Sequence, residues 1–196
     1  MSNPSTPYGF KDLGLIDGSE PNFGFVAGLI AANNTNKIYG GDVAKPIAAG
    51  VYDVFTAAVG GGAPIGGIFT TNFKWYSQAA GRLVYNSAWL GATGDLVANS
   101  QPSCGVLVHP NSVFQARSLG TSGGPVTASQ VGSLVNFGLG SAPGNNQISA
   151  FGIDDATIGA GPALPFKIYG IVQAPESDPT SIYNEVLVIF NNESIQ

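Results

Sequence analysis

Charge is what this chain has least of. Only 10% of its 196 residues are charged, compared with about 25% in a typical soluble domain. Asp and Glu outnumber Lys and Arg by 12 to 7, and the basic residues form no cluster. Binding to a nucleic-acid backbone depends on such clusters. We therefore expect no nucleic-acid partner.

Cysteine and histidine are nearly absent. Cys104 is the only cysteine, so an internal disulfide is excluded, and His109 is the only histidine. Zinc sites combine several of these two residue types. The pair Asp154–Asp155 lacks the surrounding pattern of a calcium-binding loop and is typical of a solvated turn. We expect no metal site and no cofactor.

Long apolar runs are missing as well. The longest, residues 23–32, has ten residues, whereas a membrane-spanning helix needs about 20. The first residues do not combine a basic region with an apolar one, as a secretory signal would. These features predict a non-secreted protein with no membrane partner.

Uninterrupted helical patterns are also lacking, because 28 Gly and 13 Pro punctuate the chain. Short runs with strand character recur instead, separated by Gly, Pro, Asn and Ser. They cover residues 23–32, 38–43, 51–55, 69–76, 83–89, 96–98, 106–108, 113–116, 134–137, 166–172 and 185–190. The pattern predicts an all-β fold, an antiparallel β-barrel or sandwich of roughly nine to eleven short strands. Pro46 should lie at a strand end or a sheet edge.

The strongest pattern is an aromatic hairpin between residues 69 and 89. A two-residue alternation separates an apolar face from a polar one in its first strand. A short Gly-containing loop at residues 77–81 joins the two strands. We expect the apolar faces to carry much of the core. Their predicted members are Phe69, Thr71, Phe73 and Trp75 in the first strand and Leu83, Tyr85 and Trp89 in the second.

Residues 1–22 are predicted to form an extended N-terminal arm, followed by a single β domain at 23–196 with residues 118–196 as a candidate second lobe. The arm's apolar residues, Tyr8, Phe10, Leu13 and Ile16, are too few to hold it by themselves. The alternatives are a disordered tail and an arm that packs on its own barrel or on a neighbour. We expect it to be mobile in the free protein and to contact a capsid or another subunit through these four residues. Deleting residues 2–20 should then leave the barrel folded.

The segment from Gly120 to Val126 contains a Gly-x-Ser-x-Gly pattern centred on Ser122. A catalytic serine needs a histidine to accept its proton and a carboxylate that orients this histidine. His109 lies 13 residues earlier with no acidic residue between, and no histidine follows Ser122. A Gly- and Ser-rich loop explains the segment better, so we expect no catalytic residue and no enzyme.

Six strand segments, in this order, resemble those of the capsid decoration proteins of tailed bacteriophages, also termed cement or head-stabilisation proteins. They are residues 38–43, 65–69, 82–89, 113–116, 164–172 and 186–192. The resemblance covers about four-fifths of the chain.

The resemblance implies a structural virion protein that binds the outer surface of a phage capsid and stabilises the assembled shell. Its partner would be the major capsid protein. A second copy of the chain is the other expected partner, and a trimer is the favoured form of such a homo-oligomer. The protein would lie on the outer face of the capsid in the virion, and in the host cytoplasm before assembly.

Two other functions compete with this interpretation. A carbohydrate-binding or host-attachment module of the virion is the main alternative, because aromatic side chains on one strand face can bind sugars. A small hydrolase built on the Ser122 loop is the third candidate, and the missing catalytic partners argue against it.

Overall fold

The computed structural model describes residues 3–19, 25–57, 64–141 and 147–191. Parts of three predicted elements, the arm 1–22, the strand 23–32 and the segment 186–192, lie outside these residues, at positions 1–2, 20–24 and 192. The all-β class is confirmed, with 45% strand, 5% helix and no helix of seven residues or more in the described chain. Its short 3-10 helices are η1 (Thr93–Asp95), η2 (Ala128–Gln130) and η3 (Asp155–Thr157).

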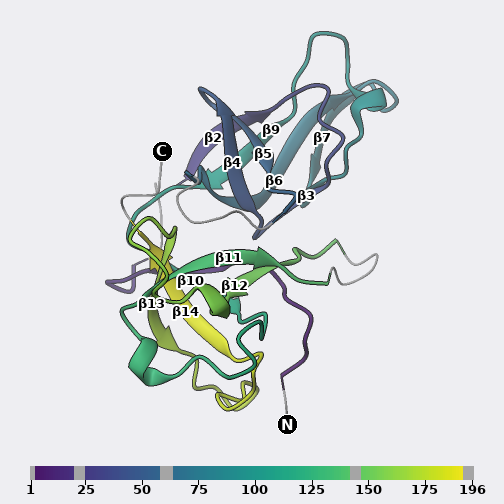
Figure 1. Cartoon of the computed structure of the whole chain (residues 1–196). Helices are drawn as coiled ribbons and strands as arrows, with labels where there is room; N and C mark the ends of the chain where they lie inside the picture. Colours follow the sequence, from purple (N-terminus) through teal and green to yellow (C-terminus); the bar gives the residue numbers. More distant parts are fainter. Residues whose placement is uncertain (1–2, 20–24, 58–63, 142–146, 192–196) are drawn as a thin grey trace.

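The described strands form two large sheets, one above the other in Figure 1. The first sheet, which we term the barrel lobe, has the strand order β4-β5-β2-β9-β6-β7. Its members are β2 (Phe25–Ile30), β4 (Val43–Ala48), β5 (Val51–Val54), β6 (Gly67–Ser77), β7 (Arg82–Asn86) and β9 (Ser103–Leu107). A short pair, β3 (Ile38–Tyr39) and β8 (Ala88–Trp89), accompanies it.

A second pairing closes the barrel lobe. Val43 and Ala44 of β4 lie opposite Ile68 and Gly67 of β6, so β4, β5, β2, β9 and β6 form a ring. Strands β2 and β5 pair in parallel, whereas the other pairs in the ring are antiparallel. Closure removes the exposed edges of these five strands. Strand β7 remains outside the ring as an edge strand.

The second sheet, which we term the sheet lobe, has the order β1-β10-β14-β13-β11-β12. Its strands are β1 (Lys11–Leu15), β10 (Ser112–Arg117), β14 (Glu185–Phe190), β13 (Phe166–Ile171), β11 (Leu134–Leu139) and β12 (Phe151–Asp154). All neighbours in this sheet are antiparallel. The sheet lobe includes β10, which precedes residue 118, and it recruits β1 from the N-terminal segment.

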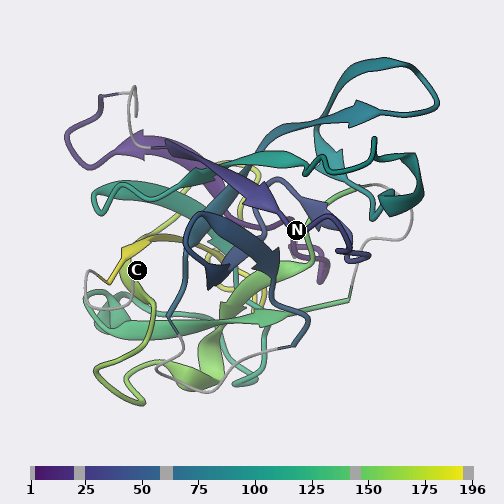
Figure 2. The same cartoon turned by 90° about the horizontal axis from the view of Figure 1, so that it is seen from above.

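One hydrophobic cluster runs through both lobes. The Phe55 ring of the barrel lobe lies 5.1 Å from the Phe137 ring of the sheet lobe, centroid to centroid. Seen from above, the two lobes overlap over much of their extent (Figure 2). The two lobes therefore share one hydrophobic core.

The predicted hairpin is present as β6 and β7, and the inner face of β6 is confirmed in the core. Phe69, Phe73 and Trp75 are buried, and so is Trp89. Thr71, by contrast, is exposed, so its predicted core position is wrong. The cause is a bulge in the β6–β9 pairing. Phe69 lies opposite Val106 and Phe73 opposite Cys104, so three residues of β6 lie between these pairs but only one residue of β9.

The predicted inner face of the second hairpin strand is also wrong. Leu83 and Tyr85 are 40% and 69% exposed. They lie opposite Tyr76 and Lys74 on the outward side of β6. Trp89 belongs to the separate strand β8, so its burial does not extend to the alternating positions of β7. The chain leaves β7 after Asn86 and begins β8 at Ala88, so the alternation of inward and outward side chains does not continue from β7 to Trp89.

Two smaller predictions have different outcomes. Residues 96–98 are not a strand, because Leu96 makes only an isolated bridge to Ser77 before a turn in which Asn99 has a φ of 63°.

Pro46 lies in β4 beside a bulge, opposite Tyr52 of β5 and beyond the short β4–β6 pairing. This position agrees with the expected sheet edge, because proline has no N–H to donate to a second neighbour.

Candidate functional site

The N-terminal segment does not form a separate arm in this structure. Residues 11–15 form β1, which pairs with β10 at the edge of the sheet lobe. The Phe10 side chain is 3% exposed and stacks on Phe166 with ring centroids 4.6 Å apart. Phe10 was predicted as a contact for a capsid or a second subunit. Its burial among the core aromatic rings corrects that prediction.

Backbone hydrogen bonds fix the same segment to both lobes. Gly9 N–H donates to the carbonyl oxygen of Phe151 at 3.0 Å, and Phe10 N–H donates to that of Gly41 at 3.0 Å. Gly9 has a φ of 85°, and a methyl group there would lie 2.5 Å from Cβ of Ser149. Only glycine fits this contact without displacing its neighbours. The described part of residues 1–22 thus packs against both lobes in this structure and is not an extended arm.

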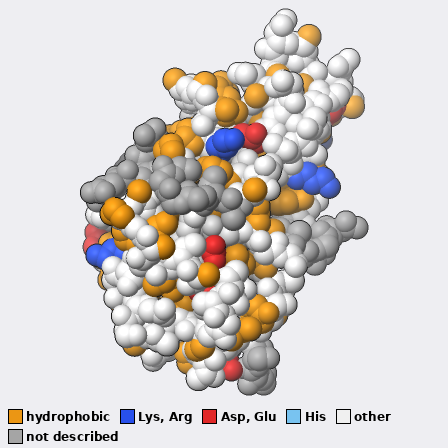
Figure 3. All heavy atoms as spheres, viewed as in Figure 1, with side chains coloured by type: hydrophobic (Ala, Val, Ile, Leu, Met, Phe, Trp, Pro, Cys, Tyr) orange, Lys and Arg blue, Asp and Glu red, His pale blue; other side chains and the backbone are white. Residues whose placement is uncertain are grey.

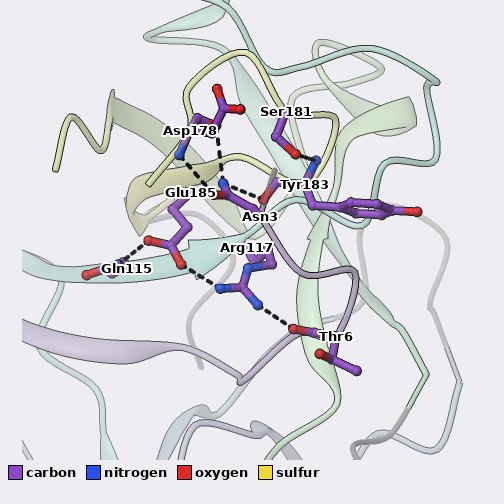
Figure 4. Close-up of polar contacts among 8 residues, drawn as sticks. All are labelled: Asn3, Thr6, Gln115, Arg117, Asp178, Ser181, Tyr183 and Glu185. Carbon is purple, nitrogen blue, oxygen red and sulfur yellow. Dashed lines mark hydrogen bonds and ion pairs between the residues drawn. The ribbon is translucent and has the colours of Figure 1, made fainter. Parts of the chain in front are cut away.

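A buried ion pair tethers the segment further (Figure 4). Arg117 donates to Glu185 at 2.8 Å and to the carbonyl oxygen of Thr6. The guanidinium carbon of Arg117 lies 4.8 Å from the centroid of the Tyr8 ring. Burial, together with the nearby Glu185 charge, raises the pKa of Tyr8 above its ordinary value. Tyr8 thus serves an internal contact in this structure.

Asn3 extends this tether at the start of the described chain. Its amide nitrogen donates to the carbonyl oxygens of Asp178 and Tyr183, and its amide oxygen accepts from Asp178 N–H. Figure 4 shows these contacts beside the ion pair. Of the four predicted contact residues, Leu13 and Ile16 are exposed, at 49% and 42%, whereas Tyr8 is half-buried and Phe10 is buried.

A row of outward-facing residues crosses six strands of the barrel lobe. Cross-strand partners define it from β7 to β4. Its members, which we term the outer row, are Tyr85, Lys74, Ser103, Leu29, Val51 and Ala48. Lys74 is its only charged member. The sheet lobe does not cover this row, since Tyr85 and Leu29 are 69% and 39% exposed.

The space-filling view in Figure 3 shows few charged side chains on the surface. On the face seen in Figure 3, hydrophobic and neutral side chains predominate and charged groups are few. Phe25 and Ile47, close to the outer row along β2 and β4, are 51% and 52% exposed. Neutral surface of this kind costs little to desolvate against another protein.

The β6–β7 hairpin carries the most exposed part of the row. Its outward face comprises two cross-strand pairs, Tyr76 with Leu83 and Lys74 with Tyr85. Tyr76 is 52% exposed. We term these four residues the hairpin face. Sequence reasoning assigned Leu83 and Tyr85 to the core, although the register of a hairpin places them opposite the outward residues of β6.

Asp95 braces the hairpin from its inner side. Its carboxylate accepts hydrogen bonds from Trp75 Nε1 at 3.2 Å, Ser77 Oγ at 2.8 Å and Ala79 N–H at 2.9 Å. The bond from Ala79, followed by those from Ser77 and Trp75, lowers the pKa of Asp95. The Trp75 ring meets the Trp89 ring edge-on at 5.5 Å. The hairpin face is therefore presented on a preorganised support.

A cavity of about 410 Å³ lies where the lobes meet, lined by Asp42, Lys37, Phe55 and Phe151 among others. Asp42 is 2% exposed and accepts a hydrogen bond from Tyr39 N–H at 2.8 Å. Burial raises the pKa of Asp42 to about 7, although hydrogen bonds from Ser149 and Tyr39 act in the opposite direction. Among the carboxyl groups of the described chain, only Asp42 has a pKa that burial raises to a value near neutral pH.

The Ser122 loop is held by Asp155 and not by the histidine. The Asp155 carboxylate accepts from Ser122 N–H at 2.7 Å and from Thr121 N–H at 2.9 Å. Burial acts to raise the pKa of Asp155, but these hydrogen bonds outweigh it and lower the pKa. His109 precedes β10 and Ser122 follows it, so a strand of roughly 20 Å separates them. The structure does not assemble the catalytic pair that a hydrolase would require.

Cys104 lies on the inner side of β9 and is 3% exposed. Burial raises the pKa of its thiol to about 12. The residue therefore behaves as a small apolar core group.

No known protein family, curated protein or solved structure matches this chain. Within the described residues, no three His, Cys, Asp or Glu side chains are placed to hold a metal ion. No helix of that part of the chain is long and apolar enough to cross a membrane.

Proposed function

We propose that this chain is a structural virion protein that binds the outer surface of a phage capsid and stabilises the assembled shell. The observation that carries the proposal is the outer row, an exposed and nearly uncharged surface that crosses six strands. The order of the six strand segments that resemble decoration proteins supports it independently.

The physical role follows from mass action. A protein that binds the assembled shell, but not the dissociated subunits, shifts the equilibrium toward the shell. Each copy needs only modest affinity, because many copies act on one particle. A rigid all-β scaffold suits this role, since little conformational entropy is lost when a preorganised surface binds.

Quantitative mass spectrometry and labelling of purified virions test the proposal. We expect many copies per particle, comparable in number to the capsid subunits and located on the head. Particles lacking the protein should lose their contents at a lower temperature than complete particles. A few copies at the tail, with unchanged head stability, would contradict the proposal.

The second candidate is a carbohydrate-binding or host-attachment module. The exposed rings of Tyr76 and Tyr85 are the observation that favours it, because an aromatic face can stack on a sugar ring. Tail location together with binding to host surface glycans would select this candidate.

A further inference from the structure

The hairpin face combines three apolar or aromatic side chains with one cation. Lys74 lies directly opposite Tyr85, and Tyr76 lies opposite Leu83. The only ion pair of the described chain joins Arg117 and Glu185, so Lys74 has no carboxylate partner within that part. The two acidic residues nearest to Lys74 along the chain, Asp53 and Asp95, are both engaged elsewhere. Asp95 accepts hydrogen bonds on the inner side of the hairpin, and Asp53 accepts hydrogen bonds from Asn34 and Asn36.

The charge of the hairpin is opposite to that of the whole protein. Residues 64–94 contain Lys74 and Arg82 and no acidic residue, whereas the chain has a net charge of −5. An acidic partner would repel most of this protein and attract the hairpin. Charge complementarity of this kind selects orientation and partner more than raw affinity.

We propose that the hairpin face is the docking surface, and that its occupant is an apolar protein surface with a carboxylate within reach of Lys74. This inference rests on the proposed function, which makes the capsid exterior that occupant. Tyr76 and Tyr85 supply large contact area with few rotatable bonds, as residues that dominate binding energy commonly do.

The same charges argue against a second copy on this face. In a two-fold symmetric dimer a surface meets its own copy, so a contact centred on the hairpin face would bring two unpaired Lys74 ammonium groups together. Like charges at an interface are unfavourable. A partner that places a carboxylate beside Lys74 avoids this repulsion between like charges.

The experiment measures binding to capsids assembled from the major capsid protein encoded in the same genome, in the absence of this chain. Tyr85→Ala and Lys74→Glu are compared with matched controls on β13 of the sheet lobe, Tyr169→Ala and Lys167→Glu. Both control residues are exposed, and Tyr169 is 46% exposed. All four substitutions lie at exposed positions, and melting curves establish that each variant is folded.

We expect each hairpin variant to weaken binding by about tenfold or more, and the controls to stay within about twofold of the unchanged protein. Added salt should weaken binding of the unchanged protein and should have little effect on Lys74→Glu, which has already lost the attraction.

Three other outcomes would contradict the hairpin inference, the proposed function or the choice of occupant. If all variants bind as the unchanged protein does, the hairpin inference is wrong and capsid binding stands. If the unchanged protein does not bind, the proposed function and this inference both fail. Sedimentation of the proteins alone decides the remaining case, because an oligomer that dissociates in the hairpin variants would make a second copy the occupant.

Discussion

The Phe10 ring lies nearly parallel to the Phe166 ring, with 16° between their planes and 4.6 Å between their centroids. Phe10 also meets Phe114 edge-on at 6.4 Å. One residue of the N-terminal segment thus joins an aromatic cluster, in which the two rings that it contacts come from β10 and β13. The segment is a structural part of the sheet lobe.

Replacing Phe10 with alanine should therefore destabilise the protein by about 3–5 kcal/mol, as expected for loss of a buried phenylalanine. Deleting residues 2–20 should be at least as severe, since it removes Phe10 together with β1, in contrast to the expectation from sequence. Urea unfolding measures both effects. Leu13→Ala is the control, because the half-exposed Leu13 side chain should contribute much less. Equal stability of the truncated and full-length proteins would contradict this assignment.

Asp42 should make the protein less stable as pH rises from about 4 to about 7. Its pKa is about 7 in the folded state and 3.8 ordinarily, so in this range the folded form keeps a proton that the unfolded form releases. The full difference corresponds to about 4 kcal/mol. It is present as a penalty above pH 7 and absent below pH 4.

The substitution Asp42→Asn removes this ionisation while keeping the shape of the side chain. We expect the variant to be more stable than the unchanged protein at pH 8 and to lose this advantage at pH 4, measured as free energies of unfolding. Asp95→Asn is the control with the opposite sign. The pKa of Asp95 is lowered, so its ionised form stabilises the fold, and the substitution should reduce stability at pH 8. A difference between Asp42→Asn and the unchanged protein that is the same at both pH values would contradict the prediction.

Local patterns were sufficient to predict the fold class and the inner face of β6. Composition excluded long helices, and a two-residue period placed Phe69, Phe73 and Trp75 inside. The β6–β7 hairpin followed from the Gly-containing turn between two patterned runs. These features depend only on residues close together in sequence.

The parts that were missed depend on distant pairings. β1 reads as a polar segment with isolated apolar residues, and only the free edge of β10 makes it a strand. The burial of Phe10 depends on Phe166, far along the chain. The outward position of Tyr85 depends on a break in the pattern before Trp89. The scarcity of charge can be read from the sequence, but only the strand register shows which residues compose the outer row.

Trp75 should be among the most sensitive positions of the hairpin. Its side chain is 7% exposed, and its indole nitrogen donates to Asp95. Trp75→Ala should cost about 3–5 kcal/mol, while Tyr85→Ala should change stability by no more than about 0.5 kcal/mol. Thermal melts monitored by circular dichroism compare the two. Similar losses for both would mean that the hairpin face is covered within the protein itself.

The Arg117–Glu185 pair should show strong coupling between its partners. Both side chains are about one-tenth exposed, and removing one charge leaves the other buried without compensation, at a cost of about 3–5 kcal/mol. Arg117→Met should therefore be much more harmful than Lys167→Met, which removes an exposed cation on β13.

The double variant Arg117→Met/Glu185→Leu separates this effect from general loss of packing. Because neither charge remains buried, we expect it to recover much of the stability lost by Arg117→Met alone. Limited proteolysis adds a second measurement, since Arg117 also bonds the Thr6 carbonyl oxygen. Both variants lack this tether and should be cut faster near Thr6 than the unchanged protein. If losses from the single substitutions merely add in the double variant, the two charges do not interact in solution and another contact must hold the N-terminal segment.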